Sequence, residues 1–220
     1  MRSPPVSWGV ALSLTLLLWA GRCPAAVWGD PRTLELVVAG TDHLLNLDHD
    51  EAEQAFSRLG DFDGTGLLGP FYRAFVKLAR VEDREATREE LDAFLATMSR
   101  ITTKAEEQLK HSPQDPDLLL LAGMAWGSRA MIDGVRGNYL SAYEGIKRTR
   151  RYFDACLQQL PTRYDAYYGL GLYDYTLSRV AWYYRPFVRL ALPPGDRERG
   201  LRGLALASER GTVTRMLSKF

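Results

Sequence analysis

The chain has 220 residues, of which 46% are apolar and 25% are charged. This composition is that of an ordinary globular protein and argues against intrinsic disorder. The 28 basic and 27 acidic residues give a formal net charge of +1. A chain so close to neutral lacks the basic excess that general nucleic-acid binding requires, so we expect no nucleic-acid partner.

The first part of the chain, residues 1–26, predicts an export signal. Arg2 provides a positive start, and residues 8–21 form an uncharged apolar run. Small residues suited to a signal peptidase follow at Ala25 and Ala26. This order is typical of a secretory signal peptide, and the run is shorter than the roughly 20 residues of a membrane-spanning helix. We therefore expect a periplasmic or secreted mature chain of residues 27–220.

Two other interpretations of this segment stay open, an uncleaved membrane anchor and a lipid anchor on Cys23. Lipidation is the minor one, because Arg22 stands where a small residue must precede the modified cysteine. Cleavage after Ala26 would leave Cys156 as the single cysteine. An internal disulfide is then excluded, and core packing must stabilise the fold.

Beyond residue 30, apolar residues recur at helical spacing between Pro, Gly and Asp, and strand signals are scarce. Residues 88–111 predict one long amphipathic helix. Thr87 and Glu90 form a capping box at its start, and Pro113 ends it. Its apolar stripe contains Leu91, Phe94, Leu95, Met98, Ile101, Thr102, Ala105 and Leu109. The sequence therefore predicts an all-α fold.

Three segments repeat a pattern of a large residue, Leu-Gly and an aromatic residue, followed by Ala, Phe and a closing Pro. The first contains Leu36, Ala39, Gly40, His43, Ala52 and Phe56. The second contains Leu119, Ala122, Gly123 and Trp126, and follows Pro113. The third contains Tyr167, Leu170 and Gly171, and follows Phe153 and Pro161, but has Asp174 at the aromatic position. This is the pattern of tetratricopeptide repeats, which predicts a solenoid of helical hairpins.

The spacing of the repeats predicts hairpins longer than usual. Gly40 and Gly123 are 83 residues apart, about 15 more than two repeats of about 34. Gly123 and Gly171 are 48 apart, about 14 more than one repeat. Four helical turns take about 14 residues, so each hairpin can gain two turns per helix without rotating its faces.

The segments NLDHDEAEQAF, RYDAYYGLGLYDY and PPGDRERGLRGLALASERG resemble exported bacterial tetratricopeptide-repeat proteins that are largely uncharacterised. The last two more distantly resemble the tetratricopeptide repeat protein 39 and Iml2 family. The resemblance covers roughly residues 34–215 and implies an α-helical solenoid, no established enzyme activity and no catalytic residues. Such a family would continue with another hairpin where only TVTRMLSKF follows. We expect either a truncated chain or an end that meets a partner or a second copy.

Three short segments suggest chemistry but predict structural roles. Residues 61–72, DFDGTGLLGPFY, resemble a calcium loop, yet Tyr72 stands where the bidentate Glu is required. Residues 43–51, HLLNLDHDE, group possible metal ligands, yet they span a helix join where Asp is the usual N-cap. Residues 147–151, KRTRR, predict a solvated helix face in preference to a phosphate or lipid site. We expect no metal and no cofactor.

The segment PTRYDAYYGLGLYDY, residues 161–175, holds five tyrosines and two aspartates. No His or Cys joins them to make a nucleophile–base pair, so we predict buried scaffold and no catalytic residue. Ten of the eleven tyrosines lie between Tyr139 and Tyr184. Such an aromatic excess can fill the core between hairpins or line a peptide groove, and both interpretations stay open.

The resulting hypothesis is a non-enzymatic, exported helical scaffold that binds a protein or peptide partner on its inner face. The candidate contact residues are Tyr168, Tyr175, Arg179, Trp182 and Tyr183. One alternative is a small-molecule or lipid carrier whose mouth is lined by Trp182, Tyr183, Tyr184 and Phe187. Another is a membrane-surface protein held by KRTRR and an uncleaved start. No feature names the partner or the oligomeric state.

Overall fold

The structure, a computed structural model, describes residue 28 and residues 30–81, 86–179 and 194–215. Its described residues are helical and contain no strand, which confirms the predicted all-α class for this part of the chain. The predicted signal peptide, residues 1–26, lies outside the described residues. The helices are α1 (Pro31–Leu45), α2 (His49–Ser57), the 3-10 turn η1 (Arg58–Asp61), α3 (Leu68–Ala79), α4 (Arg88–His111), α5 (Pro116–Val135), α6 (Tyr139–Gln159), α7 (Asp165–Ser178) and α9 (Arg197–Arg210).

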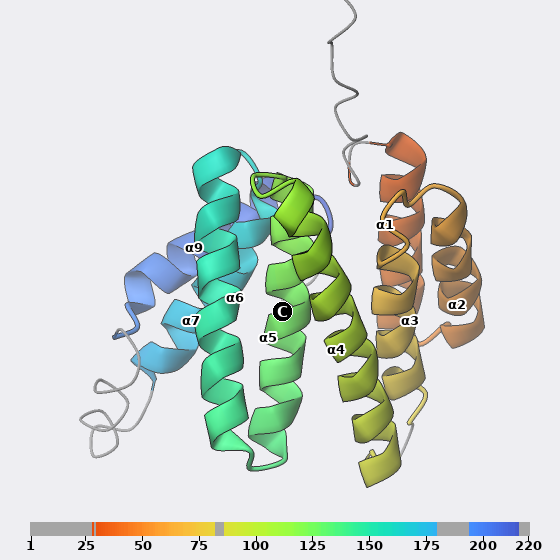
Figure 1. The fold of residues 1–220 in the computed structure, drawn as a ribbon, viewed down its shortest axis with the longest axis horizontal. Helices are drawn as coiled ribbons and strands as arrows, with labels where there is room; N and C mark the ends of the chain where they lie inside the picture. The colour runs from red at the N-terminus through yellow and green to blue at the C-terminus, as the bar shows by residue number, and fades with distance from the viewer. Residues whose placement is uncertain (1–27, 29, 82–85, 180–193, 216–220) are drawn as a thin grey trace, which may run out of the picture.

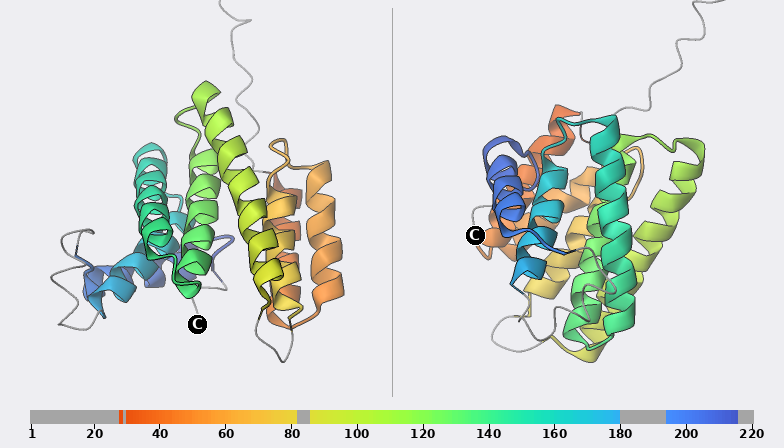
Figure 2. Two further views of the ribbon diagram at one scale, coloured as in Figure 1. Left: turned by 60° about the horizontal axis from the view of Figure 1, so that its bottom comes forward. Right: turned by 90° about the vertical axis from the view of Figure 1, so that its left-hand side faces the viewer.

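The helices stand side by side in a row, with α2 at one end, α1 and α3 next to it, and then α4, α5 and α6 leading to α7 and α9 at the other end (Figure 1). Each helix packs mainly against the helices that precede and follow it. The row therefore consists of four consecutive hairpins, α1–α2, α3–α4, α5–α6 and α7–α9, as the turned views also show (Figure 2).

Side-chain caps fix where several of these helices begin. Asp30, Asp115 and Asp196 each accept a hydrogen bond from a backbone N–H in the first turn of α1, α5 and α9. Helix α4 begins after Thr87 with the predicted capping box, in which Thr87 and Glu90 bond each other's backbone N–H. Its bounds are those predicted from sequence.

Glycines allow the paired helices of two hairpins to approach closely. A β-carbon at Gly40 of α1 would lie 2.5 Å from the ring of Phe56 in α2. A β-carbon at Gly123 of α5 would lie 2.5 Å from the ring of Phe153 in α6. The ring of Phe153 also packs against Gly169 of α7, so it joins three helices.

The α5–α6 hairpin is two turns longer per helix than α1–α2, as the spacing predicts. In the first hairpin, the turn residue Leu47 lies seven residues after Gly40 and nine before Phe56. In the longer hairpin, Gly137 lies fourteen residues after Gly123 and sixteen before Phe153. The difference of seven residues is about two turns on each side, so the same faces meet. Helices α4, α5 and α6 accordingly reach further down than α2 (Figure 1).

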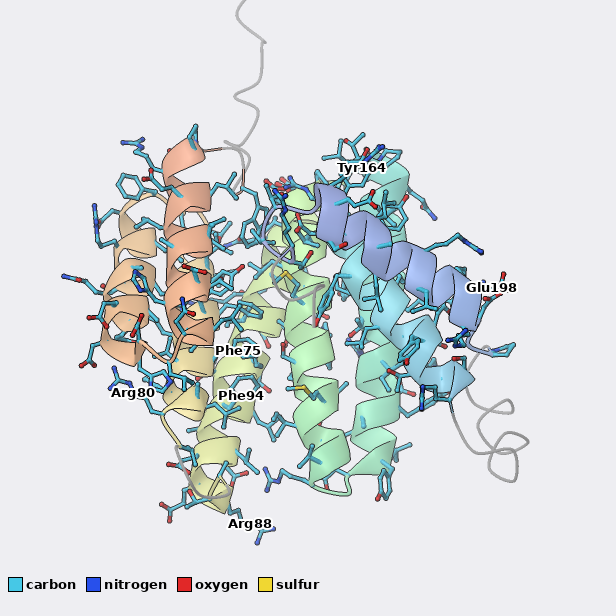
Figure 3. All side chains as sticks on the ribbon, turned by 180° about the vertical axis from the view of Figure 1, so that it is seen from behind. Phe75, Arg80, Arg88, Phe94, Tyr164 and Glu198 are labelled. Atoms are coloured by element: carbon cyan, nitrogen blue, oxygen red, sulfur yellow. The ribbon has the colours of Figure 1, made fainter. Side chains whose placement is uncertain are left out.

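The hairpin α3–α4 is not predicted as a repeat, because it lacks the Phe, although Leu68, Gly69 and Tyr72 have the Leu-Gly and aromatic spacing of the motif. Ala105, eight residues before Pro113, stands where α6 has Phe153, eight residues before Pro161. Aromatic contacts join these helices instead. The rings of Phe75 and Phe94 meet edge to face with centroids 5.2 Å apart (Figure 3).

Helix α5 forms the centre of the core. It contacts α4 and α6, and Leu120, Leu121 and Ala125 are fully buried. By length and composition α5 is apolar enough to cross a membrane, but 56% of its apolar window is buried inside the protein. Burial of this extent is typical of the core helix of a folded protein.

Candidate functional site

Among the described residues, helix α7 is covered on two sides, by α6 and α9, and leaves a third side open. Close contacts with α9 occur at Gly171, where a β-carbon would lie 2.8 Å from the carbonyl oxygen of Gly200. The contact with α6 is made by Gly169 against Phe153. The residues between these contacts share the remaining face at helical spacing. They are Tyr168, Leu172, Tyr175 and Arg179.

Helix α5 likewise leaves one face uncovered by the described part of the chain, at the corresponding position. Gly123 and Gly127 pack against α6, and Arg136 pairs with Asp92 of α4. The stripe left between them contains Met124, Ser128, Met131 and Val135. Met131 and Val135 are 53% and 76% exposed. Met124 follows Gly123 as Leu172 follows Gly171, so the two stripes lie on the same side of the row of hairpins. We call these two stripes the inner face.

Three of the five predicted contact residues lie together on the inner face. Tyr168, Tyr175 and Arg179 belong to the α7 stripe, and Arg179 Nη1 donates a hydrogen bond of 3.1 Å to Tyr175 Oη. Burial raises the pKa of Tyr168 above its usual value. Sequence reasoning missed Leu172, which is 45% exposed, although it stands four residues after Tyr168. Trp182 and Tyr183 lie outside the described residues.

The residues of the carrier alternative cannot be placed on this surface. Tyr184 and Phe187 lie outside the described residues, as do Trp182 and Tyr183. Among the tyrosines that are described in residues 161–175, every side chain is half-buried. The tyrosine-rich segment is therefore neither pure core nor a fully open groove, and it belongs in part to each of the two predicted environments.

Asp165, the first residue of α7, holds a distant, non-helical segment of the chain that bends around its carboxylate. Its Oδ1 atom accepts hydrogen bonds of 2.8–2.9 Å from the backbone N–H groups of Thr212, Val213 and Thr214. The hydroxyl groups of Thr212 and Thr214 donate to the same carboxylate at 3.0 and 2.9 Å. Most aspartates at helix starts in this protein cap their own helix. The carboxylate of Asp165 instead accepts hydrogen bonds from residues that lie 47 to 49 positions further along the chain. We call residues 212–214 the strap.

Asp117, in the first turn of α5, holds the N-terminal side of the described chain in a similar way. Its carboxylate accepts a 3.2 Å hydrogen bond from the backbone N–H of Trp28 and pairs with the guanidinium of Arg163. Asp117 is 1% exposed. Burial raises the pKa of this carboxyl group, and the positive charge of Arg163 opposes the rise.

Asp117 and Asp165 occupy one position of the repeat. Each precedes the glycine of its helix, Gly123 or Gly171, by six residues. Both lie at the same end of their inner-face stripes, and each binds the backbone of a chain segment that is not helical. The first hairpin has Leu34 six residues before Gly40 and so lacks this carboxylate, whereas Asp63 precedes Gly69 of α3 by the same six residues.

The second aspartate of the tyrosine-rich segment also has a structural partner. Asp174 is 5% exposed and pairs with Arg199 of α9, whose Nη2 lies 2.6 Å from Oδ1. Both aspartates of this segment are thus buried and hydrogen-bonded by residues far along the chain. The arrangement agrees with the predicted scaffold role of the segment.

The segment 61–72 forms a turn that caps a helix. Asp63 accepts 2.7 Å hydrogen bonds from the backbone N–H groups of Leu67 and Leu68, where α3 begins. In the segment 43–51, His43 lies 3.6 Å from Asp48, and Asp48 makes no side-chain cap, which differs from the expected N-cap. Nowhere in the described ranges do three His, Cys, Asp or Glu residues gather as a metal site would require.

The basic segment KRTRR is only partly the solvated face that the sequence predicts. Arg148 pairs with Glu106 of α4 at 3.3 Å and stacks on Trp126 of α5 at 4.5 Å. Arg150 stacks on Tyr173 of α7 at 5.1 Å. These arginines bind neighbouring helices, which sequence periodicity along one helix does not reveal.

Cys156 of α6 is buried beside the N-terminal end of α5. Its Sγ donates a 3.2 Å hydrogen bond to the carbonyl oxygen of Pro116. Burial raises the pKa of this thiol to about 12. A thiol with that pKa is protonated at neutral pH and is a poor nucleophile.

Comparison with known proteins adds no assignment, because neither a family model nor a curated protein matches the chain.

Proposed function

We propose that the chain is a non-enzymatic scaffold of tetratricopeptide-repeat type, exported from the cytoplasm, that binds a partner protein through its inner face. The supporting observation is that this side of the molecule already binds polypeptide backbone. Asp165 accepts three successive backbone N–H groups from the strap.

The exposed composition of the inner face supports the same proposal. Leu172, Met131 and Val135 are 45%, 53% and 76% exposed, and the half-buried tyrosines of α7 lie beside them. Apolar and aromatic side chains exposed in this way contribute much of the binding energy of protein interfaces. The polar groups beside them, Arg179 and Ser128, are suited to the rim of such an interface.

The proposal is tested by affinity capture with residues 27–220 from the exported compartment, followed by mass spectrometry of proteins and small molecules. We expect one stoichiometric protein partner, and its capture is expected to be lost with Leu172→Glu. Leu201→Glu is the matched control, because Leu201 is 40% exposed on α9 and lies outside the inner face.

Three results would contradict the proposal. Capture of a lipid or metabolite without protein would favour the carrier. Release of the chain from membranes by high salt, without a protein partner, would favour the membrane-surface alternative. Substrate turnover by the purified chain would show an enzyme.

A further inference from the structure

The strap is bound to Asp165 as a ligand is bound to a site. Two hydroxyl groups and three backbone N–H groups of residues 212–214 converge on one carboxylate. The side chain between the two threonines, Val213, is 6% exposed and belongs to the hydrophobic core. The site therefore fits a residue pattern, hydroxyl–apolar–hydroxyl, in a bent backbone that turns three successive N–H groups toward one oxygen.

The carboxylate is well suited to hold a segment that is not part of its own helix. Asp165 is 2% exposed, so its charge requires hydrogen-bond donors, and the strap supplies them. Backbone N–H groups are present in every segment except at proline, so another segment that bends in the same way offers the same three donors. The hydroxyl groups and the apolar side chain supply the selectivity.

One buried polar group within electrostatic reach of Asp165 stays unsatisfied by the described part of the chain. The hydroxyl of Tyr72 has no hydrogen-bond partner among the described residues, although Tyr72 is only 8% exposed. Burial raises the pKa of Tyr72 well above its usual value, and the charge of Asp165 adds to the rise. Tyr72 Oη therefore lies within electrostatic reach of the site, where a segment with a suitable acceptor would bond it.

We propose that Asp165 marks a binding site for short bent segments of the pattern hydroxyl–apolar–hydroxyl, which the strap occupies until a partner's segment of the same pattern replaces it. This inference rests on the proposed scaffold function and specifies the chemistry of the partner. The position of Asp165, three residues before Tyr168, makes the site continuous with the inner face.

The test uses residues 27–220 and a fluorescent, blocked peptide Gly-Thr-Val-Thr, with Gly-Ala-Val-Ala as the matched control peptide. Thr212→Ala with Thr214→Ala weakens the strap and leaves Asp165 intact. We expect this variant to bind Gly-Thr-Val-Thr at least tenfold more tightly than the unaltered chain, because two competing hydrogen bonds are gone. Asp165→Asn is expected to abolish binding of the peptide.

A second measurement needs no substitution. In the unaltered chain, saturating Gly-Thr-Val-Thr is expected to accelerate hydrogen exchange at the amides of residues 212–214, whereas Gly-Ala-Val-Ala has no effect. Exchange that stays unchanged would overturn the proposal, as would equal binding of both peptides to the weakened-strap variant.

The partner-capture experiment separates this inference from the scaffold function. A partner captured equally well by the unaltered chain and by the weakened-strap variant would overturn displacement of the strap and leave the scaffold proposal standing. Peptide binding without any captured partner would contradict the scaffold proposal and support the Asp165 site.

Discussion

Phe153 packs its ring against the backbone of Gly123, where a β-carbon would lie 2.5 Å from ring atom Cε1. No real β-carbon contact is so short, so the close approach of α5 and α6 depends on the missing side chain. Phe153 cannot move away easily, because Gly169 of α7 borders the other side of the same ring. The ring of Phe153 therefore holds α5, α6 and α7 together.

Gly123→Ala is therefore expected to destabilise the protein. Alanine favours a helix by up to about 1 kcal/mol, but overpacking a core costs about 1–3 kcal/mol. We expect a net loss of about 1–2 kcal/mol in the free energy of unfolding, measured with urea. Gly60→Ala is the control, since a β-carbon there would have no neighbouring atom within 4 Å, and it should change stability by less than about 0.5 kcal/mol.

Arg199→Ala is expected to cost more than removal of an exposed ion pair. It leaves the carboxylate of Asp174, whose side chain is 7% exposed, buried without its partner. Loss of a buried partner costs about 3 kcal/mol or more, and we expect about 2 kcal/mol because Arg199 itself is 51% exposed. Arg202→Ala removes the exposed Arg202–Glu198 pair and should cost less than about 1 kcal/mol. Equal losses in urea unfolding would contradict the role given to burial.

The fold is predictable where its signals are local. The bounds of α4 follow from Thr87, Glu90 and Pro113, which act within a few residues of the helix ends. The hairpin α3–α4 escapes prediction as a repeat because Ala105 stands where the Phe is expected, and the contact between Phe75 and Phe94 that joins its helices belongs to no motif. The side chains that pack its two helices together are far apart in sequence, so no local pattern reveals that they meet.

The site is predictable only in part, for the same reason. The helical spacing of Tyr168, Tyr175 and Arg179 is enough to place them on one face. The roles of Asp165 and Asp174 depend on partners 25 to 49 residues away, which no periodicity indicates. A single sequence shows that these aspartates lie in an apolar helix, but it does not show which groups donate hydrogen bonds to their carboxylates.

Cys156 is expected to resist alkylation in residues 27–220 at pH 8, because its pKa of about 12 leaves almost no thiolate. Unfolding in guanidinium should restore rapid labelling. The unfolded thiol titrates near its ordinary value of 9.0, below the folded one, so the unfolded state loses its proton first. The free energy of unfolding should therefore fall by about 1.4 kcal/mol per pH unit above about pH 9.

The comparison variant for this prediction is Cys156→Ala. It has no thiol to titrate, so the difference between its unfolding free energy and that of the unaltered chain should change between about pH 9 and 12. A difference that stays constant over this interval would show that the folded thiol titrates normally. Rapid alkylation of the folded chain would lead to the same conclusion.

Leu47→Gly is expected to stabilise the protein. Leu47 has a φ of 67° and is 67% exposed, so it adopts a left-handed conformation and gains little from burial. The equivalent turn of α5–α6 uses Gly137, with a φ of 76°. In both turns, the backbone N–H of the residue after the left-handed one donates to a carbonyl oxygen of the preceding helix. Asp48 donates to His43 at 2.9 Å, and Asn138 donates to Asp133 at 2.8 Å.

Because the two turns share this geometry, the reciprocal change, Gly137→Leu, should have the opposite sign. Leu47→Gly relieves backbone strain in the folded state, but glycine also has more conformational freedom in the unfolded chain. The net expected gain in the free energy of unfolding is about 0.5–1 kcal/mol. Gly137→Leu should lose about 1 kcal/mol or more. Thermal and urea unfolding measure both. A loss of stability in Leu47→Gly would show that the exposed leucine makes a contact worth more than the strain it imposes.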